Sequence, residues 1–237
     1  MKYKAILFDL DGTLLPLDQD LFIKTYLKAL AMKLAPYGYE PESLVASILK
    51  GTDAMLANDG KRINAEVFWD RFSEITGKDT RADEWMFEDF YKNEFQNVSK
   101  ITSVDPDAVS LVKHLGDIGV RCVLATNPVF PAIATESRIR WAGLEPSDFE
   151  LYTTYENIGY AKPNLDYYRD IIARLGLDAT ECLMVGNDID DDMVAEAIGM
   201  DVFLLTDNLI NRKGKDISNY HRGNFRVLRD FLDTDAG

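Results

Sequence analysis

Short apolar runs alternate with longer stretches of helical periodicity along most of the 237-residue chain. Apolar or β-branched runs bounded by Gly, Asn, Asp or Pro are typical of buried strands. The runs that predict strands are Lys4–Asp9, Val120–Thr126, Phe149–Thr153, Glu181–Gly186 and Asp201–Leu205.

Stretches with apolar residues at helical spacing separate the later strands. Each ends at a glycine, the residue that most readily adopts the left-handed conformation with which many helices close. The predicted helices are Pro106–Ile118, Ala132–Ala142, Leu165–Leu175 and Asp190–Ile198, followed by Gly119, Gly143, Gly176 and Gly199. Alternation of strand and helix predicts parallel strands with crossover helices, so we expect an α/β fold with a doubly wound parallel sheet.

The segment between the first and second strands contains no convincing strand. Apolar residues recur in it at helical spacing, for example at Ile23, Leu27, Leu30 and Leu34. We therefore predict a helical subdomain at residues 16–98, inserted into a core domain made of residues 1–15 and 99–237. The alternative is that these helices simply cover one face of the sheet.

The C-terminal part of the chain is more polar. Residues 207–224 are rich in Asn, Lys, Arg and Gly, which predicts an exposed loop. Residues 225–232 have the pattern of a closing helix, and residues 233–237 are expected to form a frayed end.

Acidic residues outnumber basic ones, with 40 Asp and Glu against 26 Lys and Arg and a formal net charge of −14. This balance argues against nucleic acid as a partner, although a local cluster of donors and a metal ion can still bind a small phosphate ester. No apolar stretch is long enough for a membrane helix, and the start lacks the pattern of a signal peptide. Cys122 and Cys182 lie in apolar runs, as expected for core residues of a cytoplasmic protein.

Polar and acidic residues follow several predicted strands, at the point where each strand ends. Ligands of open α/β sheets bind beyond the carboxyl ends of the strands, so we expect these residues to converge on one crevice. They are Asp9-Leu10-Asp11-Gly12-Thr13, Thr126-Asn127-Pro128, Gly159-Tyr160-Ala161-Lys162-Pro163 and the acidic segment Gly186–Asp192. Bringing Asp9, Asp11 and Asp188 together is unfavourable unless a cation intervenes, and oxygen ligands of this kind predict Mg²⁺.

These residues resemble the four motifs of the haloacid dehalogenase (HAD) superfamily, most of whose members are Mg²⁺-dependent phosphatases. The motifs occur in order, as Asp9-Leu10-Asp11-Gly12-Thr13, Thr126, Lys162-Pro163 and Gly186–Asp192. The resemblance extends from residue 4 to about residue 205. It implies a HAD-like Rossmannoid core, and residues 16–98 are similar to the helical cap of the C1 type in that family.

The resemblance assigns roles to the motif residues. It implies that Asp9 is a nucleophile that forms an aspartyl-phosphate. Asp11 is then a general acid and later a general base, and its backbone carbonyl also binds the metal ion. Thr126 and the N–H of Asn127 are expected to hold phosphate oxygens. Lys162 is expected to neutralise Asp9 and the transferred phosphoryl group, so the predicted catalytic residues are Asp9, Asp11, Thr126 and Lys162.

The fourth motif departs from the commonest form in the family, which has Asp directly after the glycine. Here Asn187 stands in that place and Asp188 follows it. The metal ligands that the resemblance implies are Asp9, Asp11 and Asp188, with Asn187 and Asp192 as secondary or outer contributors. Which of these side chains touches the metal ion directly stays open at this point.

The function that the sequence favours is Mg²⁺-dependent hydrolysis of a small phosphorylated metabolite through an aspartyl-phosphate. One alternative is a phosphomutase, because Leu49-Lys50-Gly51-Thr52 resembles a cap loop of β-phosphoglucomutase-like members. Those enzymes carry Arg where this chain has Ala54, and Lys50, Lys61 or Arg62 could take its place. Two further alternatives are a 2-haloacid dehalogenase and a catalytically idle binding protein. The first does not need Asp11 and the second does not need intact motifs, so the presence of these residues argues against both. The substrate and the oligomeric state stay open.

Overall fold

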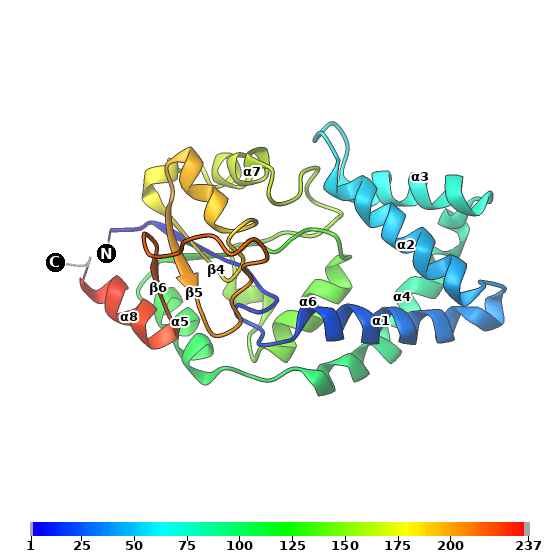
Figure 1. Ribbon diagram of the computed structural model, residues 1–237, viewed down its shortest axis with the longest axis horizontal. Helices are drawn as coiled ribbons and strands as arrows, with labels where there is room; N and C mark the ends of the chain where they lie inside the picture. The colour runs from blue at the N-terminus through cyan, green and yellow to red at the C-terminus, as the bar shows by residue number, and fades with distance from the viewer. Residues whose placement is uncertain (1, 235–237) are drawn as a thin grey trace.

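The computed structural model describes residues 2–234, in which six strands form one parallel sheet (Figure 1). The strands are β1 Ala5–Phe8, β2 Arg121–Leu124, β3 Leu151–Tyr152, β4 Cys182–Gly186, β5 Asp201–Leu205 and β6 His221–Gly223. Their order is β3-β2-β1-β4-β5-β6. The α/β class and the parallel sheet are thus confirmed, and each predicted strand is present within its expected bounds.

Strand β6 corrects the sequence analysis, which placed residues 207–224 in an exposed loop. Residues 221–223 pair in parallel with β5, with Phe203 opposite His221. The strand is short, lies at the edge of the sheet and is largely exposed, so it needs no apolar run. A strand of this kind carries no hydrophobic pattern from which it could be predicted.

Strand β1 lies in the centre of the sheet, between β2 and β4. All four of its residues are buried, because helices cover both faces of the sheet. Ile6 and Phe8 belong to the hydrophobic cluster on one face, and Ala5 and Leu7 to the cluster on the other. The chain leaves β1 toward β2 on one side and returns to β4 on the other, which places a ligand crevice beyond the end of β1.

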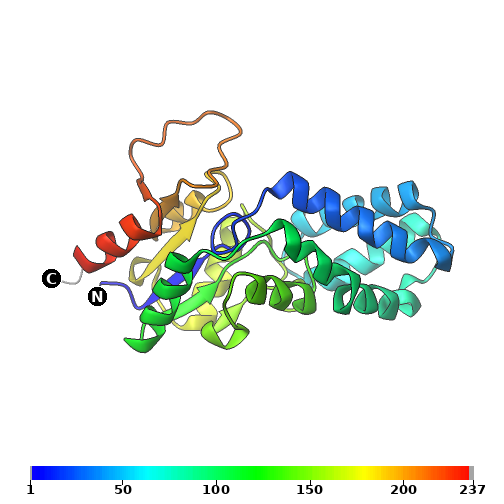
Figure 2. The ribbon, with the colours of Figure 1, turned by 90° about the horizontal axis from the view of Figure 1, so that it is seen from below.

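Helices flank the sheet in two layers (Figure 2). They are α5 Pro106–Asp117, α6 Ala132–Trp141, α7 Leu165–Leu175 and α8 Phe225–Thr234, with short 3₁₀ helices η4 Pro146–Asp148, η5 Ala179–Glu181 and η6 Met193–Ile198. The predicted glycine endings are confirmed, since Gly119, Gly143, Gly176 and Gly199 all have positive φ. The expected helix at 190–198 is instead a turn followed by η6, because the Asp188 carboxylate accepts the N–H groups of Asp190 and Asp191.

The remaining helices lie beyond the carboxyl ends of the strands rather than over a sheet face, as Figures 1 and 2 show. They are α1 Gln19–Leu34, η1 Ala35–Tyr37, α2 Pro41–Leu56, α3 Asn64–Thr76, η2 Thr80–Asp83, α4 Glu84–Lys92 and η3 Glu94–Ile101. We call residues 16–98 the helical segment. A division of the chain at residues 16 and 98 stays a prediction, and η3 continues past this boundary.

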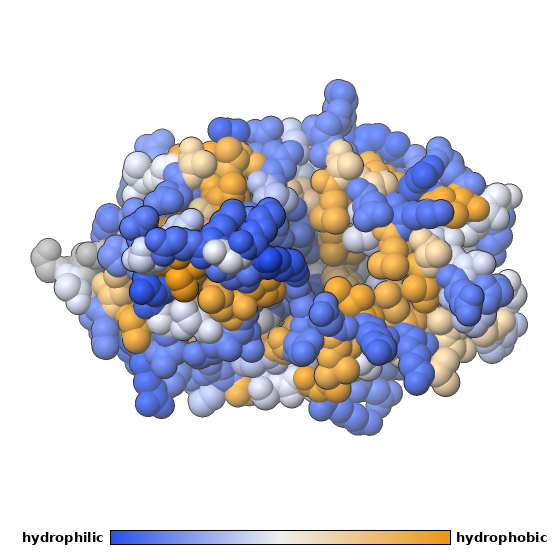
Figure 3. Space-filling view, viewed as in Figure 1, coloured by the Kyte–Doolittle hydropathy of each residue, from blue (hydrophilic) through white to orange (hydrophobic). Residues whose placement is uncertain are grey.

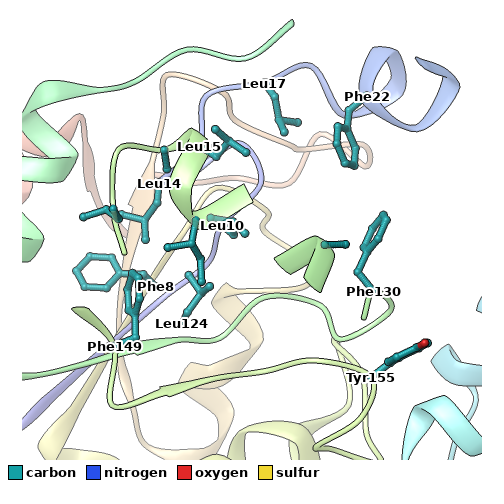
Figure 4. Close-up of a cluster of buried hydrophobic side chains, with 14 of the residues drawn as sticks. Phe8, Leu10, Leu14, Leu15, Leu17, Phe22, Leu124, Phe130, Phe149 and Tyr155 are labelled. Atoms are coloured by element: carbon teal, nitrogen blue, oxygen red, sulfur yellow. The ribbon is translucent and has the colours of Figure 1, made fainter. Parts of the chain in front are cut away.

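The helical segment has an aromatic core. Phe68, Trp69, Phe72 and Phe87 pack on one another with ring centroids 5.2–5.9 Å apart. Trp85 lies outside this core and is 54% exposed. Phe22 of α1 packs near Phe130 where the helical segment meets the sheet and its flanking helices, which we call the sheet domain. Figure 4 shows both rings beside the apolar side chains that follow β1.

Candidate active site

Asp9 is the first residue after β1, and its backbone N–H donates to the carbonyl of Val185 in the neighbouring strand β4. This bond continues the pattern of the sheet and fixes the direction of the Asp9 side chain. Lys162 Nζ lies 2.8 Å from Asp9 Oδ1. The structure therefore joins the first and third predicted motifs, as the convergence of strand ends requires.

Lys162 is buried between two carboxylates. Its Nζ also donates to Asp192 Oδ1 at 2.6 Å, and its residue exposure is only 2%. Burial lowers the pKa of Lys162, but the charges of Asp192 and Asp9 outweigh it and raise the pKa well above its usual value. The ammonium therefore stays charged across the physiological range.

Asp192 has contacts that differ from those expected of a secondary metal ligand. Oδ1 accepts from Lys162, and Oδ2 accepts the backbone N–H of Asp188 at 2.9 Å. A side chain at Gly186 would overlap this carboxylate, so the glycine at the end of β4 makes room for it. Both oxygens of Asp192 are bound to protein donors, which favours a role in holding Lys162.

Asp11 lies in the turn that follows β1. Gly12 allows this turn, because its φ is +81° and a side chain there would overlap Asn187. Asp11 Oδ2 accepts from Arg138 Nη1, whereas Asp11 Oδ1 is buried without a partner among residues 2–234. Burial raises the pKa of Asp11, Arg138 lowers it and the neighbouring Asp9 raises it, with a net upward shift.

Arg138 lies outside the four predicted motifs. It lies in α6, four residues after Ala134 and four before Ala142, both of which are buried. A charged residue at helical spacing from buried alanines is the signal that could have found it, because a buried guanidinium requires a counterion.

Asn187 ties two motif loops together. Its Oδ1 accepts from the hydroxyl of Thr13 at 2.9 Å, and its Nδ2 donates to the carbonyl of Asn208 at 2.7 Å. The side chain is buried. Its amide group is thus bound to protein on both sides, which supports a positioning role rather than that of a secondary metal ligand.

Thr126 and Asn127 follow β2, next to the end of β1. The carbonyl of Thr126 accepts from the hydroxyls of Thr153 at 2.6 Å and Tyr167 at 2.8 Å, which fixes the loop from behind. Asn127 Oδ1 is buried without a partner in the described part of the chain. The loop is therefore anchored through the carbonyl of Thr126, and it leaves one buried side-chain acceptor without a partner at the strand end, among the residues that the structure describes.

Asp188 lies in the loop after β4, and its carboxylate organises this loop. Oδ1 accepts the N–H groups of Asp190 at 2.8 Å and Asp191 at 3.1 Å, and Oδ2 accepts from Arg212 Nη1 at 3.1 Å. Arg212 is a solvent-exposed side chain, so this last contact is open to exchange with another cation.

The donor atoms at the end of β1 fit Mg²⁺. Across residues 2–234, no three His, Cys, Asp or Glu side chains are grouped to hold a metal ion. A Mg²⁺ site needs fewer than three such side chains, because Mg²⁺ commonly binds one or two carboxylates together with waters and substrate phosphate. Within the described chain, Asp9 Oδ2 and the backbone carbonyl of Asp11 accept no hydrogen bond. These are hard oxygens of the type that Mg²⁺ prefers, and Asp188 would join them by exchanging its contact with Arg212.

A cavity of about 500 Å³ opens beside Asp11, between the sheet domain and the start of α1. Figure 3 shows the surface hollowed between these two parts of the molecule. Its lining is mostly polar and includes Asp18, Gln19, Asn208 and Arg212. The cavity is large enough for a small organic molecule.

Two of the three cations that could hold a second phosphate group, Lys61 and Arg62, are paired with nearby carboxylates. The segment 49–52 is helical, since it lies within α2, so the expected cap loop is wrong. A side chain at Gly51 would come within 2.8 Å of Phe68, which shows that this glycine serves helix packing. Arg62 pairs with Glu66 at 3.1 Å and Asp70 at 2.6 Å, and Lys61 pairs with Asp59 at 2.5 Å.

No helix within residues 2–234 has the length and apolar character needed to cross a membrane. The two cysteines of the chain are buried free thiols.

Comparisons with known proteins agree with this geometry. A family model described as haloacid dehalogenase-like hydrolase matches residues 3–199. A ribulose-1,5-bisphosphate 5-phosphatase from Halopiger xanaduensis is 27% identical over 209 residues, which is 84% of this chain and 83% of that protein.

Solved structures share the fold. A 2-haloacid dehalogenase from Pseudomonas syringae has a TM-score of 0.65 at 21% identity, covering 98% of this chain and 99% of that one. A HAD phosphatase from Thermococcus onnurineus has a TM-score of 0.59 at 23% identity, covering 97% of each chain. A HAD-hydrolase from Bacillus subtilis, solved with bound magnesium, has a TM-score of 0.58 at 20% identity, covering 98% of this chain and 100% of that one.

Proposed function

The chain belongs to the haloacid dehalogenase-like hydrolase family, and we propose that within this family it is a Mg²⁺-dependent phosphatase of a small phosphorylated metabolite. The observation that carries the proposal is the contact of Lys162 with Asp9, two residues before Asp11, whose Oδ1 is buried. A nucleophile, a cation beside it and a second carboxyl group are the parts that phosphoryl transfer through a covalent intermediate requires.

Asp9 acts as the nucleophile. One of its oxygens attacks phosphorus in line, an O–P bond forms, and the bond from phosphorus to the leaving alkoxide breaks. Lys162 is held next to Asp9 and offsets the negative charge that gathers on the phosphoryl oxygens. Because the ammonium is already buried and fixed between two carboxylates, it needs no reorganisation when the substrate arrives.

Asp11 is the general acid and then the general base of the reaction. Its carboxyl group donates a proton to the leaving alkoxide, and the resulting carboxylate then accepts a proton from the water that hydrolyses the aspartyl-phosphate. The raised pKa of Asp11 supports the first step, because it favours the protonated form. A halide leaves without protonation, so this second carboxyl group favours phosphoryl transfer over dehalogenation.

Thr126 and Asn127 would hold phosphate oxygens from the neighbouring strand end. Asp9, the backbone carbonyl of Asp11 and Asp188 would hold Mg²⁺, which supplies charge neutralisation for the phosphoryl oxygens when bound. Asn187 and Asp192 keep these loops in place through the contacts described above.

The helical segment, residues 16–98, would act as a C1-type cap on a core of residues 1–15 and 99–237. It would cover the cavity beside Asp11, exclude bulk water and contact the leaving group. A cavity of about 500 Å³ favours a small metabolite, and the phosphatase from Halopiger xanaduensis, by its name, acts on a small phosphorylated sugar. Such a substrate is consistent with a cytoplasmic enzyme.

The test is release of inorganic phosphate from a panel of sugar, nucleotide and organic acid phosphates, with and without Mg²⁺. We expect turnover that Asp9→Asn abolishes and that the control Asp190→Asn preserves, because Asp190 pairs with the surface residues Lys213 and Lys215. Isomerised sugar phosphate instead of free phosphate would identify a mutase. Halide release from a 2-haloacid would identify a dehalogenase, and no turnover of any of these compounds would leave a binding protein.

A further inference from the structure

Arg138 is a fully buried arginine in the middle of α6, with 0% exposure. Removing a guanidinium from water costs several kcal/mol unless good partners compensate, so an unneeded arginine is disfavoured at such a position. Arg138 lies at the junction between the sheet domain and the helical segment, close to the turn that carries Asp11. Its burial therefore requires an explanation.

Every part of the guanidinium has a defined neighbour. Nη1 donates to Asp11 Oδ2, Nη2 donates to the hydroxyl of Thr135 at 3.3 Å, and Nε donates to the carbonyl of Ala134 at 3.4 Å. The ring centroid of Phe130 lies 4.3 Å from the guanidinium carbon, and that of Phe22 lies 5.9 Å from it. Figure 4 shows both rings at this junction. The planar group is thus fixed in position and in orientation.

This fixed cation determines how the Asp11 carboxyl group is oriented. The terminal torsion of an aspartate is broad, so a carboxyl group without a strong partner samples many orientations. Oδ2 is bound to Arg138, and Oδ1 is buried without a partner among the described residues, while Asp11 lines the large cavity. A buried polar atom without a partner is rare in folded proteins and points to a ligand atom that completes it.

We propose that Arg138 is a positioning residue, which holds the Asp11 carboxyl group by Oδ2 so that Oδ1 faces the oxygen of the leaving group. The proposal rests on the proposed function, because it concerns the proton transfer of that reaction. Arg138 contacts neither Asp9 nor Lys162, so its effect is confined to the two proton transfers in which Asp11 takes part. The oxygen that gives up the proton is Oδ1, and the leaving alkoxide receives it.

A purely structural role makes a different prediction. If Arg138 only filled the junction, an apolar side chain of similar length would serve as well or better, because buried ion pairs are often replaceable by hydrophobic residues. Loss of packing would slow hydrolysis of all substrates alike. Loss of positioning would lower kcat/KM, which reports formation of the aspartyl-phosphate, only for substrates whose leaving group needs a proton.

The experiment compares Arg138→Met and Arg138→Lys with wild type on two substrates, an alkyl phosphate from the panel and p-nitrophenyl phosphate. The quantity kcat/KM reports the steps up to formation of the aspartyl-phosphate. For Arg138→Met we expect kcat/KM on the alkyl ester to fall about 100-fold, within the range of general acid catalysis. On the aryl ester, whose leaving group departs without a proton, we expect a loss of less than about fivefold, and Arg138→Lys should recover part of the alkyl activity.

The matched control is Arg140→Met, two residues along the same helix, where the side chain is exposed and pairs with Glu136 and Glu145. It should change neither activity. In the Asp11→Asn background, Arg138→Met should cause no further loss on the aryl ester, because a residue that acts through Asp11 has nothing left to position. Circular dichroism and melting curves of each variant establish that it is folded.

The outcomes are distinguishable. Equal losses on both esters, or a further loss in the Asp11→Asn background, would overturn the role of Arg138 while the phosphatase proposal stands. If wild type hydrolyses neither ester under any metal condition, the proposed function and this inference fail together.

Discussion

Lys162 Nζ lies 2.8 Å from Asp9 Oδ1, across a sequence separation of 153 residues. The same ammonium lies 2.6 Å from Asp192, so two carboxylates share one buried cation. This arrangement supports the loop after β4 as well as the nucleophile. The charge of the Lys162 ammonium is therefore expected to affect both the stability of the fold and the reaction at Asp9.

Lys162→Met should lower both stability and activity. It leaves Asp9 and Asp192 facing each other without a cation, and breaking a buried pair typically costs about 3–5 kcal/mol. Urea unfolding measures the loss, and the double variant Lys162→Met/Asp192→Asn should recover part of the stability but not the phosphate release. Equal stability of the single and double variants would contradict the shared-cation interpretation.

Magnesium should bind at Asp188 rather than at its acidic neighbours. A ligand that binds only the folded state increases the free energy of unfolding, by about 2.7 kcal/mol at a ligand concentration of 100 Kd, and so raises the melting temperature. We expect the Mg²⁺-induced shift of the melting temperature to shrink strongly in Asp188→Asn. In Asp190→Asn the shift should persist, because that carboxylate pairs with Lys213 and Lys215. Chelation with EDTA should abolish phosphate release, and restored Mg²⁺ should recover it.

The sequence was sufficient for features that depend on local pattern. Buried strands, glycine endings and motif residues at strand ends each have a signature in neighbouring residues, and the convergence of strand ends places Asp9 near Lys162. Pairings that depend on side-chain packing have no such signature. Nothing in the motif distinguishes Asp192 from Asp188, because the difference lies in which carboxylate reaches Lys162. Arg138 is identified as the partner of Asp11 only once α6 is packed against the turn.

Gly186→Ala should disturb the site more than the added methyl group alone suggests. A Cβ at this position would overlap the Asp192 carboxylate, so the side chain that holds Lys162 must move. Overpacking of this kind typically costs about 1–3 kcal/mol, and phosphate release should fall with it. The control is Gly116→Ala in α5, where a Cβ meets no atom within 4 Å. That substitution should stabilise the protein by about 0.5–1 kcal/mol in urea unfolding, because alanine favours the helix.

The helical segment contains an acid-sensitive contact remote from the site. Asp83 Oδ2 accepts from Lys78 Nζ at 2.7 Å and from the hydroxyl of Tyr39 at 2.6 Å. These hydrogen bonds lower the pKa of Asp83 from its usual 3.8, against the opposing effect of burial. A carboxyl group with a lowered pKa stabilises the folded state above its unfolded pKa, and this contribution is lost as pH falls through the folded pKa.

Asp83→Asn should therefore destabilise the protein at pH 7 by about 1 kcal/mol, a modest value because Lys78 is partly exposed. The difference from wild type should shrink below about pH 4, where the wild-type carboxylate begins to bind a proton. Urea unfolding from pH 7 down to pH 3 measures it, with Glu88→Gln in an exposed pair as control. The control should change stability by less than about 0.5 kcal/mol, and phosphate release at pH 7 should be unchanged in both variants. A difference between Asp83→Asn and wild type that stays constant with pH would show that packing of the side chain, and not its charge, stabilises this part of the helical segment.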